Sequence, residues 1–457
     1  MSSSSYRSRS VALRIALLAL LVAIAACSGG ASSDTTTDAS TGTTASAPGT
    51  TAGATATTAG ATATTAGATA TTAAPSAGGC DRPYDESVLD PRPLPASLNP
   101  ESAMPAIEEM TITSGDLGSL PDVAPAWYDT LTVTPEQVKE ICEQELTAVF
   151  LDWADALYNQ IIRSGQRLTL QAMGIDLARV TSFSFDPNGL AGNLASVLPL
   201  EPDIIFTGGT IDPNQFAAIM QPAVDQGITI ISWGVGANGW ETGPEGEITS
   251  MIGYDFYQLG RQMAVAVCEK YPDGANLGYI HWINNINAIH LREQGFLDGL
   301  AEDCPQITVI ADGGPADPKG SNSGFSDPNA AQADTAAFLV RHPEVNVLFA
   351  PWEDPPGLGI ESAIKSSGLE GQVDIVTMDL GVAGANQLAA DGTITVDMAQ
   401  SIFDGGRSMA LAAGLHSIGE EVPPFVIFPT FAANSENLPD AWEFMHGPEF
   451  PLPVATD

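Results

Sequence analysis

From about residue 146 onwards, short apolar segments rich in β-branched residues alternate with longer segments in which apolar residues recur with the period of a helix. The predicted strands are residues 146–151, 175–181, 203–207, 228–232, 277–281, 307–311, 345–350, 374–378 and 394–398, with a crossing near 252–255. Strands that are apolar almost throughout are typical of parallel sheets covered by helices on both faces. Because these strands are too many for one such sheet, we predict an α/β protein with two doubly wound parallel-sheet lobes joined by a multi-strand hinge.

The charge of the chain limits its partners. Lys and Arg number 16 and Asp and Glu number 55, which gives a net charge of −39. Such a charge repels phosphate backbones and anionic lipid headgroups, so we expect no nucleic-acid partner. Charged residues are only 16% of the chain and apolar residues 44%, so most of the chain is able to bury a core.

Residues 1–27 have the pattern of an export signal. Three arginines precede an apolar stretch that is short for a membrane span, and the stretch ends in Ile-Ala-Ala-Cys at Cys27. This ending resembles the bacterial lipobox, in which the cysteine is lipidated and becomes the new N-terminus. The alternative is an ordinary secretory signal with a chance cysteine, and either interpretation predicts an exported chain.

Residues 28–79 consist almost entirely of Ser, Thr, Ala and Gly, and the heptad TTAGATA repeats three times. No residue there is able to build a core, so we predict a disordered tether. Residues 80–140 follow as a Pro-rich N-terminal extension, to which the sequence assigns no role.

Several stretches of the folded part resemble type I periplasmic solute-binding proteins of the ribose/galactose-binding group. The matching segments are PDIIFTGGTIDPNQFAAIMQPAVDQGITIIS (202–232), IGYDFYQLGRQMA (252–264), HLREQGFLDGL (290–300), LFAPWEDPPGLGIESAIKSSG (348–368) and DIVTMDLGVAGANQLAADGTITVDMAQ (374–400). No single motif is specific, but five in the family's order and spacing are specific together.

The resemblance implies a fold and a function. Residues 141–254 with 401–425 are expected to form the N-terminal lobe, and 255–400 with 426–450 the C-terminal lobe. The expected protein is a monomeric lipoprotein on the outer face of the cell membrane, which captures a sugar, polyol or similar small polar ligand between its lobes and delivers it to an ABC permease. A ligand-sensing co-receptor for a membrane signalling protein is the alternative within the same fold.

Three polar residues at predicted strand ends are the main candidates for ligand binding. Arg292 lies in the motif similar to the family's Arg-x-x-Gly-Phe signature, and its planar fork can bind two hydroxyls or a carboxylate. Asp379 and Gln400 match the family's sugar-binding Asp and hinge Gln. Asp379 has an alternative role as the N-cap of the next helix, and Arg292 and Gln400 have alternatives as surface or linker residues.

Three further acidic residues are weaker candidates. Glu353 and Asp354 occupy the positions of the family's Asn-Asp pair, although Glu353 departs from the usual Asn and Asp354 could instead cap its helix. Asp152 ends the first predicted strand. Gly234 stands where the family commonly has an Asp, which argues against ribose or galactose itself.

Five of the seven tryptophans fall at or just past predicted strand ends: Trp153, Trp233, Trp240, Trp282 and Trp352. An indole offers a flat apolar face and one N–H donor, and two indoles can enclose a sugar ring between them. We expect Trp153 and Trp352 to do so most strongly, with Trp233 and Trp282 also at the ligand. The alternative for each tryptophan is packing within a lobe.

Four cysteines remain after Cys27, and they allow three disulfide connectivities. Export favours oxidation. Cys268 and Cys304 end predicted helices that flank one strand, so we expect them to pair, which leaves Cys80 with Cys142.

Several other classes of protein are disfavoured. GxGxxG at 234–239 follows a strand, but the continuation to Pro244 breaks a helix, so no dinucleotide site is expected. The nucleophile motif GxSxG, HExxH and CxxC are all absent, so we expect no catalytic residue, no metal and no cofactor. A purely structural wall-associated lipoprotein is disfavoured by the tryptophans at strand ends.

Overall fold

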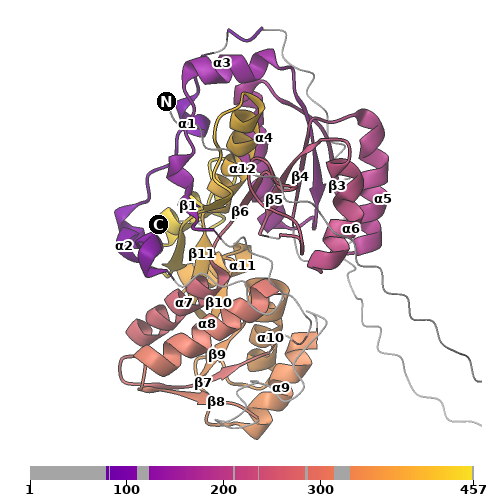
Figure 1. The fold of residues 1–457 in the computed structure, drawn as a ribbon. Coiled ribbons are helices and arrows are strands. Elements are labelled where there is room, and N and C mark those ends of the chain that lie inside the picture. Colours follow the sequence, from indigo (N-terminus) through magenta and orange to yellow (C-terminus); the bar gives the residue numbers. More distant parts are fainter. Residues whose placement is uncertain are drawn as a thin grey trace, which may run out of the picture. The chain divides into compact units, whose positions relative to one another are not determined.

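The computed structural model describes residues 79–454 except 82, 111–122, 209–211, 235, 282, 284–286 and 313–329. Two sheets are present, with strand orders β1-β12-β6-β5-β4-β2-β3 and β13-β11-β10-β9-β7-β8 (Figure 1). All neighbouring strands run parallel except β11 and β13, which are antiparallel. The predicted α/β class with two doubly wound parallel sheets is confirmed.

The first sheet is built mainly from the first half of the chain. Its strands are β1 (Ala126–Trp127), β2 (Thr147–Asp152), β3 (Asp176–Ser182), β4 (Ile204–Gly208), β5 (Thr229–Trp233), β6 (Ser250–Gly253) and β12 (Phe425–Ile427). The helices associated with it are α3 (Pro135–Glu143), α4 (Leu157–Met173), α5 (Pro187–Val197), α6 (Pro213–Val224) and α12 (Ile402–Ser417). Figure 1 shows α4 and α12 on one side of this sheet and α5 and α6 on the other.

The second sheet follows the crossing that leaves β6. Its strands are β7 (Ala275–Tyr279), β8 (Ile307–Ile310), β9 (Val347–Phe349), β10 (Asp374–Met378), β11 (Ile394–Gln400) and β13 (Thr430–Ala433). Its helices are α7 (Phe256–Lys270), α8 (Asn287–Asp303), α9 (Ala331–Arg341), α10 (Leu358–Ser366), α11 (Val382–Ala389) and α13 (Leu438–His446). The chain passes between the sheets three times, through α7, through α12 and between β12 and β13.

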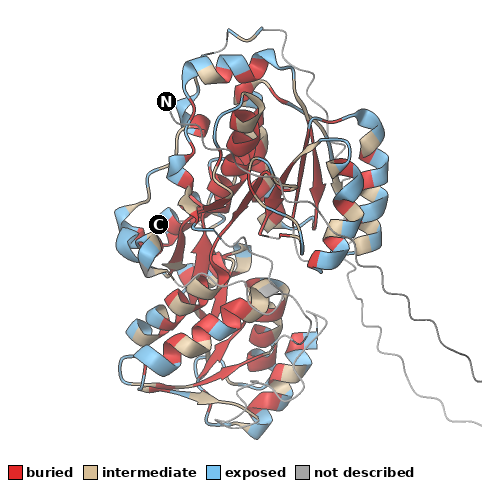
Figure 2. Ribbon diagram, viewed as in Figure 1, coloured by how far each residue is buried: buried red, intermediate tan, exposed pale blue. Residues whose placement is uncertain are grey.

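The predicted strands all overlap observed ones, because apolar runs of this kind stay buried on both faces of a parallel sheet. The central strands β2, β4, β5, β9 and β10 are buried over nearly their whole length (Figure 2). The short strands β1, β12 and β13 were not predicted. Their sequences are too short to show a period, and only pairing with distant strands makes them strands.

The extension that the sequence left without a role packs against the first sheet and the hinge. It contains β1 and the short helices α1 (Glu86–Leu89) and α2 (Pro100–Ala103). The fully buried Arg407 of α12 donates hydrogen bonds to the carbonyl oxygens of Leu89, 2.9 Å, and Tyr128, 3.1 Å. From α7, Gln262 donates to the carbonyl of Ser102 at 2.6 Å. The extension therefore satisfies buried polar groups from elements on both sides of the hinge.

The four described cysteines lie in two pairs with the spacing of disulfides. The Cα atoms of Cys80 and Cys142 are 5.5 Å apart, and those of Cys268 and Cys304 are 5.7 Å apart. The second pair joins the C-terminal ends of α7 and α8. Cys27 and the predicted tether lie outside the described residues. Within the described ranges, no helix is both long enough and apolar enough to cross a membrane.

Candidate functional site

A polar cluster lies where the second sheet's strands end, and it contains all three main candidates. Arg292 of α8 donates to both carboxylate oxygens of Asp379, from Nη2 at 2.9 Å and from Nη1 at 3.0 Å. Gln400, the last residue of β11, donates from Nε2 to Asp379 Oδ1 at 2.8 Å. The fork of Arg292 thus meets Asp379 in the bidentate geometry that makes such pairs strong and directional. The carboxyl ends of the adjacent parallel strands β10 and β11 bring Asp379 and Gln400 together, and α8 supplies Arg292.

Close packing of α7 on α8 sets the position of Arg292. A Cβ atom on Gly260 of α7 would overlap the carbonyl oxygen of Arg292, and one on Gly295 of α8 would overlap that of Tyr257. Only glycine permits this approach of two helix backbones. Arg292 is 4% exposed as a result, and its Nη1 also donates to the carbonyl of Pro351 at 3.2 Å.

Two tyrosines that the sequence reading missed continue the cluster. Arg292 Nη2 donates to the hydroxyl of Tyr254, which follows β6, and Tyr254 is hydrogen-bonded to Tyr158 of α4. Burial raises the pKa of both phenols, so each stays neutral and is able to donate and accept. Burial lowers the pKa of Arg292, but Asp379 more than offsets this, and the guanidinium remains charged. Tyr254 lies between Gly253 and Asp255, and this sequence context gave no signal of its role.

The turn after β10 presents Asp379 to its partners. Asp379 has a left-handed φ of +84°, and its N–H donates to the carbonyl of Met398 at 2.7 Å. Helix α11 begins at Val382 with Gly381 as its N-cap, so Asp379 does not cap it. Among the described residues, neither Gln400 Oε1 nor Arg292 Nε has a hydrogen-bond partner, although both atoms are buried. The cluster therefore contains one buried acceptor and one buried donor that no described residue satisfies.

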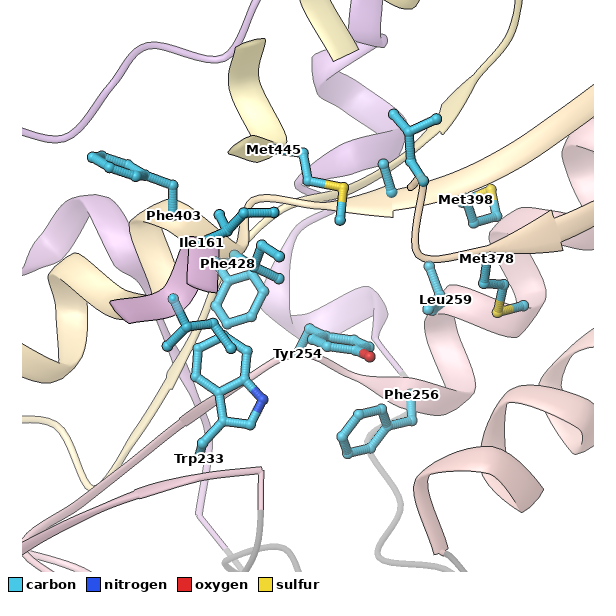
Figure 3. Close-up of a cluster of buried hydrophobic side chains, with 14 of the residues drawn as sticks. Ile161, Trp233, Tyr254, Phe256, Leu259, Met378, Met398, Phe403, Phe428 and Met445 are labelled. Atoms are coloured by element: carbon cyan, nitrogen blue, oxygen red, sulfur yellow. The ribbon is translucent and has the colours of Figure 1, made fainter. Parts of the chain in front are cut away.

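Two tryptophans at strand ends of the first sheet, Trp153 and Trp233, pack on each other (Figure 3 shows Trp233 and its neighbours). The rings of Trp153 and Trp233 stack with centroids 6.0 Å apart and planes at 28°, and Trp233 lies 5.1 Å from Phe428. A ring enclosed by two indoles needs about 7–8 Å between them, since each carbon–carbon contact takes 3.5–4.0 Å. These two indoles consequently enclose no ligand between them, and both are about 95% buried. The outer face of Trp153 stays a predicted ligand contact.

The other tryptophans are dispersed. Trp352 is half-buried after β9, on the second sheet, and Trp240 packs edge-on against Phe216. Trp282 lies outside the described residues. Tyr158 meets Trp233 edge-on at 6.2 Å, which joins the aromatic group of the first sheet to the polar cluster.

Asp152, the last residue of β2, is held by side chains of the following helix α4. It is fully buried and accepts from Arg163 at 2.7 Å and from Asn159 at 2.5 Å, both on α4. Burial raises the pKa of Asp152 to about 6, and the charge of Arg163 opposes the shift. These bonds fix the turn that carries Trp153.

Glu353 and Asp354 lie on opposite sides of the backbone. Glu353 is 2% exposed, and both its carboxylate oxygens accept backbone N–H groups of the turn at 381–384. Asp354 is exposed and caps no helix. Ligand contact by either residue stays a prediction.

Two observations on the described residues concern other kinds of ligand. The Gly-rich segment at 234–239 is followed by turns and an isolated bridge, and the next helix, α7, begins only at Phe256. The part of the chain that the structure describes holds no group of three His, Cys, Asp or Glu residues able to bind a metal.

Residues 202–421 match the family model described as periplasmic binding protein domain. Among characterised proteins, the fructose import binding protein FruE of Bifidobacterium longum is 28% identical over 149 residues, which are 32% of this chain and 42% of FruE. The chain thus aligns with less than half of the length of that relative.

Solved structures of solute-binding proteins share the fold. A protein from Agrobacterium vitis bound to α-D-tagatopyranose has a TM-score of 0.56 at 20% identity, covering 66% of this chain and 100% of that one. A second protein from the same organism, with bound allitol, has a TM-score of 0.53 at 16% identity and covers 64% of this chain and 96% of its own. The family resemblance read from the sequence is confirmed.

Proposed function

We propose that this chain, which carries a periplasmic binding protein domain at residues 202–421, captures a neutral polyhydroxylated molecule and delivers it to an ABC importer. The ligand class is a sugar or polyol. The relatives are a fructose import binding protein and proteins bound to a ketohexose and a hexitol, which supports this class. Because the relatives are transporter proteins, the co-receptor alternative gains no support.

One observation carries the proposal. The charges of Arg292 and Asp379 cancel and Gln400 is neutral, so the cluster has no net charge that a charged ligand would neutralise. Arg292 and Asp379 already satisfy each other in a bidentate pair, so a carboxylate or phosphate ligand would compete with Asp379 for the guanidinium. A hydroxyl group both donates and accepts, so it can donate to Asp379 while accepting from Arg292. Adjacent hydroxyls of a sugar therefore match the cluster better than an anion does.

The remaining parts of the proposal follow from the sequence. Export by the signal at 1–27, lipidation of Cys27 and a tether at 28–79 would hold a monomeric binding domain at the outer face of the membrane. The matched family consists of binding proteins, and we propose that this chain catalyses no reaction.

A thermal-shift screen followed by calorimetry tests the proposal. The panel contains D-tagatose, D-fructose, D-allose and allitol, with D-gluconate and D-glucose 6-phosphate as charged counterparts. A neutral member is expected to raise the unfolding temperature, because a ligand bound only by the folded state stabilises it. The charged counterparts are expected to have no effect.

Two matched variants test whether the ligand binds at the cluster of Arg292, Asp379 and Gln400. Asp379→Asn should weaken binding at least tenfold, whereas Asp374→Asn, at the opposite end of the same strand, should not. Tighter binding of the charged counterparts, or equal affinities of the two variants, would overturn the proposal.

A further inference from the structure

Two buried carboxyl groups lie directly behind the Asp379 turn. Glu353 is 2% exposed and Asp397, on β11, is fully buried. Glu353 Oε1 accepts from the N–H of Gly384 at 2.8 Å, and Oε2 accepts from the N–H of Gly381. Asp397 Oδ1 accepts from the N–H of Leu380 at 3.0 Å. Three backbone donors of the turn that follows Asp379 therefore end on these two side chains.

The fourth oxygen of the pair has no N–H or hydroxyl partner within the described ranges. This atom, Asp397 Oδ2, is buried. A Cβ built on Gly384 would lie 2.5 Å from Asp397 Oδ2 and 2.6 Å from Glu353 Oε2, so the two oxygens converge over the same glycine. Two ionised carboxylates this close and this deeply buried would repel each other, and a single proton between them removes the conflict.

We propose that Glu353 and Asp397 are positioning residues of the ligand site, which share one proton carried on Asp397 Oδ2 and hold the 379–384 turn so that Asp379 faces Arg292 and Gln400. The proposal deepens the proposed function and rests on it only for its ligand measurements.

The hydrogen bonds identify the carrier of the proton. Each oxygen of Glu353 already accepts an N–H group, whereas Asp397 Oδ2 accepts none, so a proton on Oδ2 displaces no backbone hydrogen bond and can be donated to the remaining lone pair of a Glu353 oxygen. Burial raises the pKa of Asp397 well above its usual value, and the charge of Glu353 raises it further. Burial also raises the pKa of Glu353, but the N–H groups of Gly384 and Gly381 oppose that shift. Asp397 is consequently the neutral acid and Glu353 the carboxylate.

The surrounding charges set the direction of the pH dependence. The negative charge of Asp354 raises the pKa of Glu353, and that of Asp379 raises the pKa of Asp397. Glu361 of α10 is paired with Lys365, and α11 carries no titratable side chain. On α13, burial lowers the pKa of His446 to about 3, so this ring next to Leu380 is neutral.

A carboxyl group whose pKa is raised by folding stabilises the fold fully below its unfolded-state pKa, and this stabilisation is lost as the pH rises from there through the raised pKa. Deprotonation of Asp397, as the pH rises through its raised pKa, would place two like negative charges behind the turn. We therefore expect the turn to loosen as the pH rises.

Two conservative variants distinguish the role of Asp397, the protonated acid, from that of Glu353, the carboxylate. Asp397→Asn keeps an acceptor for Leu380 N–H and places an NH₂ donor toward Glu353, so it reproduces the protonated acid. Glu353→Gln turns an NH₂ group toward the N–H of Gly381 or Gly384 and loses one bond. Asp374→Asn, which neutralises a carboxylate at the other end of β10, is the control.

The first measurements need no ligand. Unfolding temperature is measured between pH 5 and 9, and amide hydrogen exchange of residues 380–384 is corrected for intrinsic rates. Wild type and Asp374→Asn should lose stability and protection as the pH rises. Asp397→Asn should retain protection without this pH dependence, and Glu353→Gln should exchange at least tenfold faster at every pH. Loss of protection in Asp397→Asn equal to that in Glu353→Gln would overturn the proposal, as would wild-type pH dependence in Asp397→Asn.

The ligand measurement uses calorimetry with D-tagatose at pH 6 and pH 9. Affinity should fall about tenfold between these values in wild type and stay constant in Asp397→Asn, while Glu353→Gln should bind about 10- to 100-fold more weakly at both. Equal pH dependence of the affinity in all variants would also count against the proposal. If D-tagatose binds none of them, the choice of ligand has failed, and the exchange and unfolding data still decide the role of the pair.

Discussion

The pairing of Arg292 with Asp379 predicts a large energetic coupling between these two residues. The test is a double-mutant cycle of Arg292→Met, Asp379→Asn and the double variant. Removing one partner of a buried ion pair costs about 3–5 kcal/mol, because the other charge is left unpaired. The Arg292 side chain is 5% exposed and that of Asp379 is 21% exposed, so we expect the lower end, about 3 kcal/mol, for each single variant.

The double variant removes both charges and leaves none unpaired. Its loss of unfolding free energy should therefore be smaller than the sum of the single losses by about 2–3 kcal/mol. Urea denaturation followed by tryptophan fluorescence measures the cycle. Every variant should also bind the ligand about 10- to 150-fold more weakly, because each loses at least one charged hydrogen bond worth about 1.5–3 kcal/mol.

The control is Arg261→Met on α7, which breaks solvent-exposed pairs with Glu302 and Asp303. An exposed pair contributes about 1 kcal/mol or less, so this variant should be nearly as stable as wild type and bind normally. Additive losses in the Arg292–Asp379 cycle, within about 0.5 kcal/mol, would refute the coupling. Unchanged affinity in both single variants would refute the location of the site.

Four further outcomes are expected. Arg407→Met should lower the unfolding free energy by about 3 kcal/mol, because it leaves buried carbonyls of the extension without donors, but it should not change ligand affinity. Cys268→Ser should cost about 4 kcal/mol for a separation of 36 residues, and free thiols at Cys268 or Cys304 in non-reducing peptide maps of the exported protein would contradict the bridge. Cys27→Ser should move the protein from the membrane pellet to the soluble fraction, and retention in the pellet would require another anchor. A chain beginning at Cys80 should bind the ligand as tightly as the longer mature chain, and loss of binding would show that residues 28–79 take part.

The strands of both sheets could be predicted because their signal is local. A strand buried on both faces needs several consecutive apolar residues, and that run is readable without knowing its neighbours. The same local reading placed Arg292, Asp379 and Gln400 near strand ends. Because the carboxyl ends of parallel strands share one edge of a sheet, the sequence also indicated that these three residues lie close together.

The partners of these residues depend on the tertiary structure. Tyr254 reaches Arg292, and Tyr158 reaches Tyr254, only because β6 and α4 of the first sheet lie next to α8. Whether Glu353 turns toward a ligand or toward the 381–384 turn depends on the position of α11, which no local pattern encodes. Trp153 and Trp233 stack on each other because β2 and β5 are both adjacent to β4, a neighbourhood set by strand order.

The extension at 80–140 shows most clearly which features the sequence indicates and which depend on the tertiary structure. Its prolines and short apolar segments give no period, so the sequence indicated only a Pro-rich stretch. The fold places Leu89 and Tyr128 against Arg407, more than 270 residues away, and hydrogen bonds to that buried guanidinium hold the stretch in place. Sequence patterns by themselves determined where strands and polar strand ends fall, since these depend on neighbours a few residues apart. Only tertiary structure decided which buried donors meet which acceptors, because that pairing joins residues from distant parts of the chain.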